Sequence, residues 1–198
     1  MDSTAVIATL QQAVPGVAIE PGTATDQPTI VVPRDRLVES MTALRDHPAL
    51  QFSLLADLSA ADYLPRAPRF EIVYHLVCLG TPGFPTGGPT TPRRLRVKVR
   101  VPGDDPRVPT VSEIWAAAGW LERETWDMFG IVFDGHPDLR RLLMPEDWEG
   151  HPLRKDYPVQ VRMVARASEP LQLSAEQFAA NIVAARRIQR KDHGKTTE

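Results

Sequence analysis

The chain has 198 residues, a formal net charge of -2 and a hydrophobic content of 42%, which suits one domain with tails or arms rather than two domains. This charge gives no global attraction to nucleic acid or to an anionic membrane, so binding to either requires a local patch. The single cysteine, Cys78, excludes an intramolecular disulfide and a cysteine-ligated iron-sulfur cluster.

The N-terminal part of the chain predicts helices that alternate with strands. Ser3 or Thr4 is expected to cap a short helix. A strand is predicted over residues 29–32, an amphipathic helix over residues 34–46 and a further strand over residues 52–58. The start has no basic region, and no apolar run approaches the roughly 18 to 20 residues of a spanning helix, so a cytosolic or partner-bound location is expected.

Two more strands are predicted over residues 70–79 and 94–101, joined by a loop rich in Gly and Pro. No Gly-Lys-Ser/Thr follows this loop and it leads into a strand, which argues against a phosphate-binding loop. One face of the second strand carries four basic residues, Arg94, Arg96, Lys98 and Arg100. Aromatic residues do not alternate with these charges, so a solvated or partner-facing surface is favoured over RNA binding.

A long helix is predicted over residues 110–129. Thr110 and Glu113 have the spacing of a capping box at its start, and Gly130 is expected to end it. A second capping box at Ser174 predicts a terminal helix with a basic C-terminal end.

The segment over residues 122–158 is dense in charged, aromatic and turn residues. Gly-His-Pro occurs twice in it, at Gly135-His136-Pro137 and at Gly150-His151-Pro152, and each copy leads into a basic pair. A residue before proline is extended, and glycine permits a positive φ, so each copy predicts a fixed bend followed by a short cationic stretch. The segment is typical of a docking surface.

Two motifs within this segment carry a resemblance to a known family. The first, E-R-E-x-aromatic-D-x-aromatic-G-I-x-F-x-G-H-P, is matched by Glu122, Arg123, Glu124, Trp126, Asp127, Phe129, Gly130, Ile131, Phe133, Gly135, His136 and Pro137. The second, P-x-D-W-x-G-H-P-L-R-K-D-aromatic-P, is matched by Pro145, Asp147, Trp148, Gly150, His151, Pro152, Leu153, Arg154, Lys155, Asp156, Tyr157 and Pro158. The segment thereby resembles the 30-kDa subunit family of proton-pumping NADH:quinone oxidoreductase, respiratory complex I.

The elements predict a single α+β domain over residues 1–130, with a mixed, mostly antiparallel sheet and helices on one face. An extended docking arm with a C-terminal helix is expected over residues 131–198. The partner-binding residues expected from the resemblance are Glu122, Arg123, Glu124, Trp126, Asp127, Phe129, His136, Arg140, Arg141, Trp148, His151, Arg154, Lys155, Asp156 and Tyr157. Arg154 to Asp156 are expected to be held by charges on the partner.

The resemblance implies a non-catalytic scaffold in the hydrophilic arm of complex I. The expected partners are the hydrogenase-like large quinone-side subunit and neighbouring cluster-bearing subunits, with no nucleic acid and with the membrane contacted only through the complex. FMN and Fe-S clusters are expected in partner subunits and none in this chain. The expected location is peripheral, on the cytoplasmic side of the cell inner membrane.

Other interpretations compete with this one. The histidines and nearby carboxylates form no His-x-x-x-His pair and have no assisting thiol, which argues against a metal site. Glu122, Glu124 and Asp127 flank Arg123, as in an ion-pair network rather than an acid-base pair. The equivalent subunit of a membrane-bound hydrogenase or a ferredoxin-driven relative remains open, as does a free-standing nucleic-acid or metabolite-binding module.

Overall fold

Five strands pair in the order β1-β2-β5-β4-β3 to form the main sheet of the computed structural model, which describes residues 2–80, 91–158 and 174. The elements are α1 Ser3–Ala13, β1 Glu20–Pro21, β2 Thr29–Val31, the 3-10 helix η1 Arg34–Arg36, α2 Leu37–Asp46, β3 Leu54–Asp62, β4 Phe70–Cys78, β5 Arg93–Val101, β6 Arg107–Pro109, α3 Ala118–Phe129 and β7 Val132–Asp134. β6 and β7 form a separate pair.

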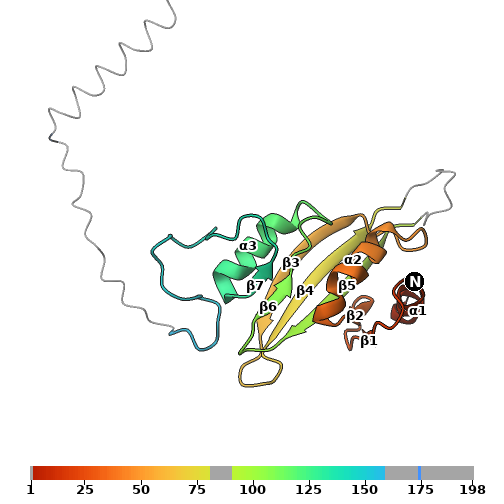
Figure 1. The fold of residues 1–198 in the computed structure, drawn as a ribbon, viewed down its shortest axis with the longest axis horizontal. Coiled ribbons are helices and arrows are strands. Elements are labelled where there is room, and N and C mark those ends of the chain that lie inside the picture. The colour runs from red at the N-terminus through yellow and green to blue at the C-terminus, as the bar shows by residue number, and fades with distance from the viewer. Residues whose placement is uncertain (1, 81–90, 159–173, 175–198) are drawn as a thin grey trace, which may run out of the picture. The chain divides into compact units, whose positions relative to one another are not determined.

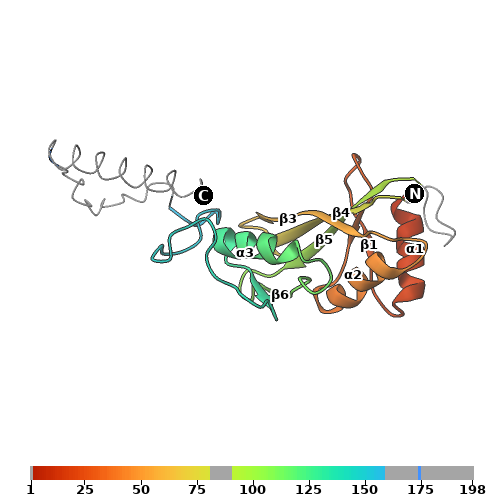
Figure 2. The same ribbon diagram turned by 90° about the horizontal axis from the view of Figure 1, so that it is seen from above.

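Antiparallel pairing dominates the main sheet. β4 runs antiparallel to both β3 and β5, and β1 is antiparallel to β2, whereas β2 lies parallel to β5. The predicted α+β class with a mixed, mostly antiparallel sheet is therefore confirmed. Figures 1 and 2 show α2 and α3 on one face of the sheet, as predicted.

The alternation of residue types along the strands sends apolar side chains toward these helices. On β4 the buried residues are Phe70, Ile72, Tyr74, Leu76 and Cys78, and on β5 they are Leu95, Val97, Val99 and Val101. All of them belong to one hydrophobic core, which also takes in Trp115 and Phe129. The opposite face of the sheet carries Arg94, Arg96, Lys98 and Arg100 of β5.

Several predicted boundaries in the N-terminal part need correction. Asp2, not Ser3 or Thr4, caps α1, because its side chain accepts a hydrogen bond from the amide of Ala5 at 2.9 Å. The strand predicted over residues 52–58 is shifted, since the corresponding strand β3 covers Leu54–Asp62. The short strands β1, β6 and β7 were not predicted.

The predicted helix start at Thr110 is also wrong. α3 begins at Ala118, and the Thr110 hydroxyl contacts the Glu122 carboxyl at 2.5 Å instead of forming a box with Glu113. Trp115 consequently lies in the turn before α3. Gly130 ends the helix as predicted, with a left-handed φ of 71°.

The first compact unit of the chain ends at Pro158. Residues 131–158, which were expected to begin the arm, therefore belong to the same unit as the sheet. The terminal helix predicted after Ser174 lies outside the described residues. None of the helices in the described part of the chain is long and apolar enough to cross a membrane.

Candidate partner-docking site

Asp127 anchors the segment after β7 to α3. Its buried carboxylate accepts hydrogen bonds from the backbone amides of Leu142 (3.0 Å), Leu143 (2.8 Å) and Met144 (2.9 Å), and from Nη1 of Arg141 (2.7 Å). Burial raises the pKa of this carboxyl, but the three amides and Arg141 outweigh burial and lower it below its usual value. A fully ionised, fully bonded carboxylate therefore fixes residues 141–144 against the helix.

Two arginines extend this network. Arg123 donates to the backbone carbonyls of Arg140 (3.2 Å) and Arg141 (3.1 Å) rather than pairing with Asp127, and its guanidinium lies 5.1 Å from the ring centre of Trp120. Arg141 also donates to the carbonyls of Trp148 (2.6 Å) and Gly150 (3.1 Å). Arg123 and Arg141 thus bond the backbone of this segment, which leaves less of their charge for a partner.

Both Gly-His-Pro bends are built as the sequence predicts. Gly135 and Gly150 have φ values of 83° and 81°, which favour glycine. His136 donates from Nε2 to the carbonyl of Gly119 (2.9 Å) and accepts on Nδ1 from the amide of Asp138 (3.0 Å).

The second histidine has an equivalent role farther along α3. Nδ1 of His151 donates to the carbonyl of Asp127 at 3.0 Å, and its ring meets the edge of Trp126 with centres 6.1 Å apart. Burial lowers the pKa of His151, which keeps the ring neutral at pH 7. Both histidines are thus structural contacts to α3 rather than free side chains.

Arg154, Lys155 and Asp156 are held by this chain itself, contrary to the expectation that a partner holds them. Nε of Arg154 donates to the carbonyl of Phe129 (2.5 Å) at the end of α3. A Cβ at Gly130 would collide with the side chains of Arg154 and His151, so glycine is required there for close approach as well as for its φ.

The ends of β3 and β4 complete this attachment. Asp62 accepts from the amide of Lys155 (2.9 Å) and from Arg69 (2.8 Å), and Arg69 also bonds Asp156 (2.6 Å). Burial raises the pKa of Asp62, but these bonds and the amide of Leu64 outweigh it and lower the pKa to about 2.

Glu122 is the buried carboxyl of α3 that lies against the core. It accepts from the amide of Val111 (2.8 Å) and from the hydroxyl of Thr110, and Nε2 of His136 lies 4.0 Å away. Burial dominates these contacts and raises the pKa of Glu122 to about 7. Its carboxyl therefore pins the loop before α3 to the helix and does not face a partner.

The structure thus divides the predicted partner-binding residues into three groups. Glu122, Asp127 and Phe129 are buried, whereas Glu124, Arg140, Lys155 and Asp156 are exposed. The half-buried residues are Arg123, Trp126, His136, Arg141, Trp148, His151, Arg154 and Tyr157. Trp148 and Tyr157 stack on each other with ring centres 6.4 Å apart.

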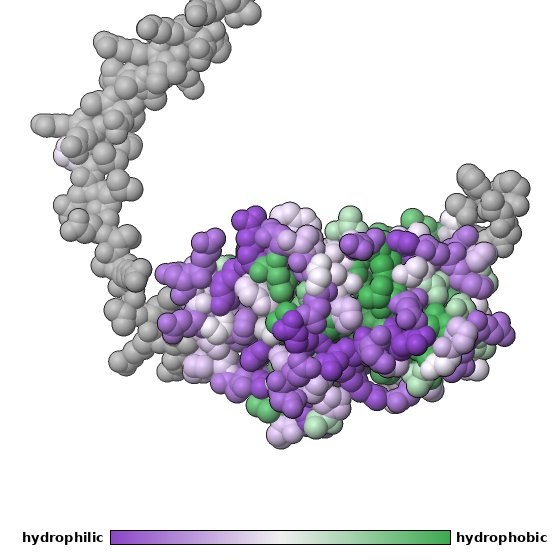
Figure 3. Space-filling model, in the orientation of Figure 1, coloured by the Kyte–Doolittle hydropathy of each residue, from purple (hydrophilic) through white to green (hydrophobic). Residues whose placement is uncertain are grey.

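Sequence reasoning missed three exposed apolar side chains in this region. Trp120 is 62% exposed, Leu143 is 60% exposed and Leu153 is 54% exposed. Figure 3 shows the helix-bearing face as mostly hydrophilic with separate hydrophobic patches. Large exposed apolar residues among charged ones are typical of interface anchors. Helical spacing contained the signal for Trp120, because it lies four residues before Glu124 on the outward side of α3.

The described residues include no group of three or more His, Cys, Asp or Glu side chains arranged to hold a metal ion. Cys78 is buried in the core of the sheet. What this region offers is a rigid surface of exposed charged and apolar side chains, fastened from behind by buried carboxylates. Such a surface can dock another protein, since it presents apolar side chains among charged ones and several of its backbone amides are already hydrogen-bonded.

Comparisons with known proteins place the chain in a family. The family model described as "Respiratory-chain NADH dehydrogenase, 30 Kd subunit" matches residues 30–162. An NADH-quinone oxidoreductase subunit of Roseiflexus sp. (strain RS-1) is 42% identical over 165 residues, which cover 83% of this chain and 89% of the relative. "NADH-quinone oxidoreductase subunit 5" of Thermus thermophilus is 52% identical over 134 residues, which cover 66% of this chain and 61% of the relative.

Two solved structures share the fold. "Nqo5 of the trypsin-resistant fragment (1-134) in P63 form" is 40% identical with a TM-score of 0.54, covering 70% of this chain and 100% of the fragment. A chain of the membrane-bound sulfane sulfur reductase, an archaeal respiratory membrane complex, has a TM-score of 0.62 at 23% identity, covering 86% of this chain and 98% of that chain. The second likeness concerns the fold alone. Together with the family model, the relatives show that this chain belongs to the 30-kDa subunit family of respiratory-chain NADH dehydrogenase.

Proposed function

We propose that this chain is a non-catalytic subunit of the hydrophilic arm of a proton-pumping NADH:quinone oxidoreductase. The observation that carries the proposal is the match of the family model to residues 30–162, which includes the whole surface built on α3. The chain holds the quinone-side and cluster-bearing subunits in register while the assembly passes electrons from NADH through FMN and Fe-S clusters to quinone.

In this proposal the docking surface consists of the outward side of α3 and the segment after β7. Its exposed members are Trp120, Glu124, Arg140, Leu143, Leu153 and Lys155. Asp127 and Asp62 hold the segment in place from beneath, so little conformational entropy is lost when a partner binds. The partner is the hydrogenase-like large quinone-side subunit, with cluster-bearing subunits beside it.

Electron carriers belong to the other subunits. The single cysteine of the chain is buried on β4, which leaves no set of thiolates for a cluster. The purified chain is expected to show no visible absorption from iron or flavin, and a stoichiometric chromophore in folded protein would contradict this division of roles.

Two kinds of complex are candidates for the assembly, and they differ in their electron donor. The names of the relatives at 42% and 52% identity favour NADH. The shared fold with a chain of an archaeal sulfane sulfur reductase complex keeps a related membrane-bound complex as the second candidate. The location that follows from either candidate is peripheral, on the cytoplasmic side of the inner membrane.

Copurification tests the proposal. A tagged copy expressed in its source cells is purified from detergent-solubilised membranes, and the proteins that accompany it are identified by mass spectrometry. Recovery with a cluster-bearing subunit, a large quinone-side subunit and NADH:quinone reductase activity is the expected result. Recovery of the tagged chain alone, at the mass of a free protein, would refute the proposal.

A further inference from the structure

The sheet face away from the helices carries its own charge pattern. Three of the four basic residues of β5 on this face pair with acids of this chain. Nη2 of Arg96 lies 2.7 Å from Asp26, Nζ of Lys98 lies 2.7 Å from Glu71, and Nη1 of Arg100 lies 2.9 Å from Glu20. This internal pairing leaves little free charge along most of the strand.

Arg94 is the exception at the other end of the row. It is exposed, and no ion pair or hydrogen bond joins its side chain to another of the described residues. Lys98 lies opposite Val73 and reaches the diagonal residue Glu71, whereas Arg94 lies opposite Val77 and its diagonal residue on β4 is His75, so neither position offers it a carboxylate. Among the residues that the structure describes, Arg94 is therefore the basic side chain of this row that has no acidic partner.

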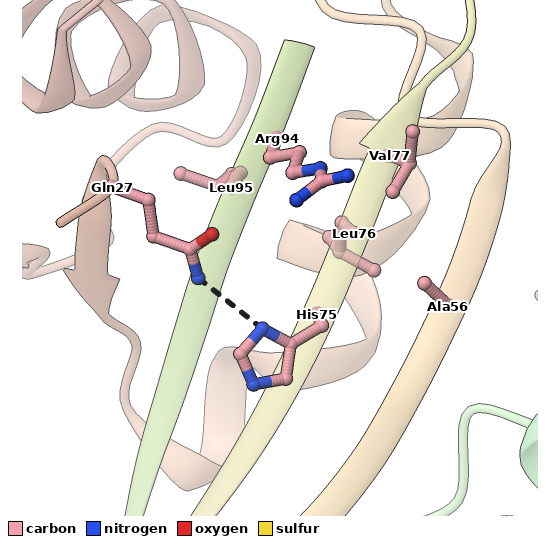
Figure 4. Close-up of a pocket in the computed structure, with 7 residues that line it drawn as sticks. All are labelled: Gln27, Ala56, His75, Leu76, Val77, Arg94 and Leu95. Carbon is pink, nitrogen blue, oxygen red and sulfur yellow. Dashed lines mark hydrogen bonds between the residues drawn. The ribbon is translucent and has the colours of Figure 1, made fainter.

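Arg94 also lines a small hollow in this face. The hollow has a volume of about 160 Å³ and is lined by Gln27, Ala56, His75, Leu76, Val77, Arg94 and Leu95. Figure 4 shows side chains from the loop before β2 and from β4 and β5 around it, with Gln27 bonded to Nδ1 of His75 at 3.2 Å. This volume is below the roughly 300 to 1,000 Å³ of a typical small-molecule site, so a single side chain fits it better than a cofactor.

We propose that Arg94 and this hollow receive a carboxylate side chain, Asp or Glu, from a neighbouring subunit. The proposal rests on the assembly proposed above and adds a second contact surface, on the face opposite α3. A guanidinium binds a carboxylate through two parallel hydrogen bonds. Val77, opposite Arg94 on β4, supplies an apolar side chain beside such a pair.

A zero-length crosslink tests the identity of the occupant. An Arg94→Lys variant is incorporated into the complex in cells, and the purified complex is treated with a carbodiimide, which joins an amine to a carboxylate in contact with it. Mass spectrometry is expected to find the peptide that contains position 94 joined to an Asp or Glu of another subunit. The matched control is Arg96→Lys, whose peptide is expected to join Asp26 of the same chain.

The contrast between the two variants decides the outcome. An internal link in the Arg96→Lys complex, with no link from position 94 to another subunit, would overturn the inference. A link from position 94 to an Asp or Glu of this chain would also overturn it, since Arg94 would then have an acidic partner within its own chain.

Competitive assembly gives an independent measurement. Wild-type and Arg94→Glu chains with different tags are co-expressed, and their ratio in the purified complex is compared with their ratio in the cell. Charge reversal is expected to lower incorporation about tenfold or more, because two like charges would meet in the hollow. Arg66→Glu, at an exposed position in the turn between β3 and β4, is the control and is expected to assemble normally.

The failure of this inference is distinguishable from failure of the proposed function. Equal incorporation of Arg94→Glu and Arg66→Glu into a complex that does contain the wild-type chain removes the carboxylate contact and leaves the subunit role intact. A wild-type chain that enters no complex removes both.

Discussion

The backbone amide of Lys155 donates a hydrogen bond of 2.9 Å to Oδ2 of Asp62, which lies at the end of β3. Arg69 reinforces this contact by bonding both Asp62 and Asp156. The end of the segment after β7 is therefore attached to the sheet, and the docking surface is formed before any partner binds.

Replacing Asp62 is expected to release this attachment. In Asp62→Asn the charge that pairs with Arg69 is lost from a buried position, so the free energy of unfolding should fall by about 3 kcal/mol. Amide hydrogen exchange should increase at Lys155 and its neighbours. Asp57→Asn, at an exposed position of the same strand, is the control and should change stability by less than about 0.5 kcal/mol. Unchanged exchange at Lys155 in Asp62→Asn would show that other contacts hold the segment.

Asp127 is expected to protect three specific amides. In Asp127→Asn the ion pair with Arg141 is lost and an NH2 group meets backbone N–H donors, so stability should fall by about 3 kcal/mol. The amides of residues 142–144 should lose most of their exchange protection. Glu124→Gln, three residues earlier on the same helix and exposed, should preserve that protection. Equal exchange in the two variants would contradict the anchoring role.

Glu122 gives the fold a pH dependence. Its pKa is about 7 in the folded state and 4.5 as the ordinary value, so the folded state binds the proton more tightly than the unfolded state. The contribution of Glu122 to stability is therefore fully present below pH 4.5 and falls by about 3 kcal/mol as the pH rises from there to 7. Urea unfolding of Glu122→Gln should lack this fall. A wild-type curve that rises across this window, with the variant parallel to it, would contradict the assignment.

The tryptophans separate core from surface. Trp115 is 5% exposed in the core, so Trp115→Ala should lower stability by about 3 to 5 kcal/mol. Trp126 is half-buried against His151 and Arg141 and should have an intermediate effect. Trp120→Ala should lower stability least, because its ring is largely exposed, but it should reduce the yield of assembled complex most. Thermal melts beside assembly yields check the order, and full assembly with Trp120→Ala would remove it from the docking surface.

Much of the fold follows from local sequence patterns. The alternation along residues 94–101 and the spacing within residues 34–46 predict β5 and α2, because a half-buried strand and an amphipathic helix depend on near neighbours. The start of α3 was misplaced for a non-local reason. Thr110 has the spacing of a cap, but Glu122, twelve residues later, takes its hydroxyl and the amide of Val111.

The docking segment, residues 135–158 after β7, shows the same limit of local sequence patterns. From the sequence alone, Arg141, Arg154 and Asp156 look free to bind a partner. Their hydrogen-bond partners on α3 and beside the end of β3 are distant in sequence and become adjacent only on folding. Glycine and proline, by contrast, act within one or two residues, so both Gly-His-Pro bends were predicted correctly. Trp120 lies just before the signature, and its exposure depends on which side of α3 meets the sheet.

The most direct measurement of the central claim is native electrophoresis of solubilised membranes from the source cells, with the chain detected by antibody and NADH oxidation detected by an in-gel stain. The account predicts that the chain migrates in the same large band as the NADH-oxidising activity, and that this band is lost when the chain is absent and restored when it is supplied again. Migration of the chain as a free protein, with the active band unchanged in its absence, would contradict the account.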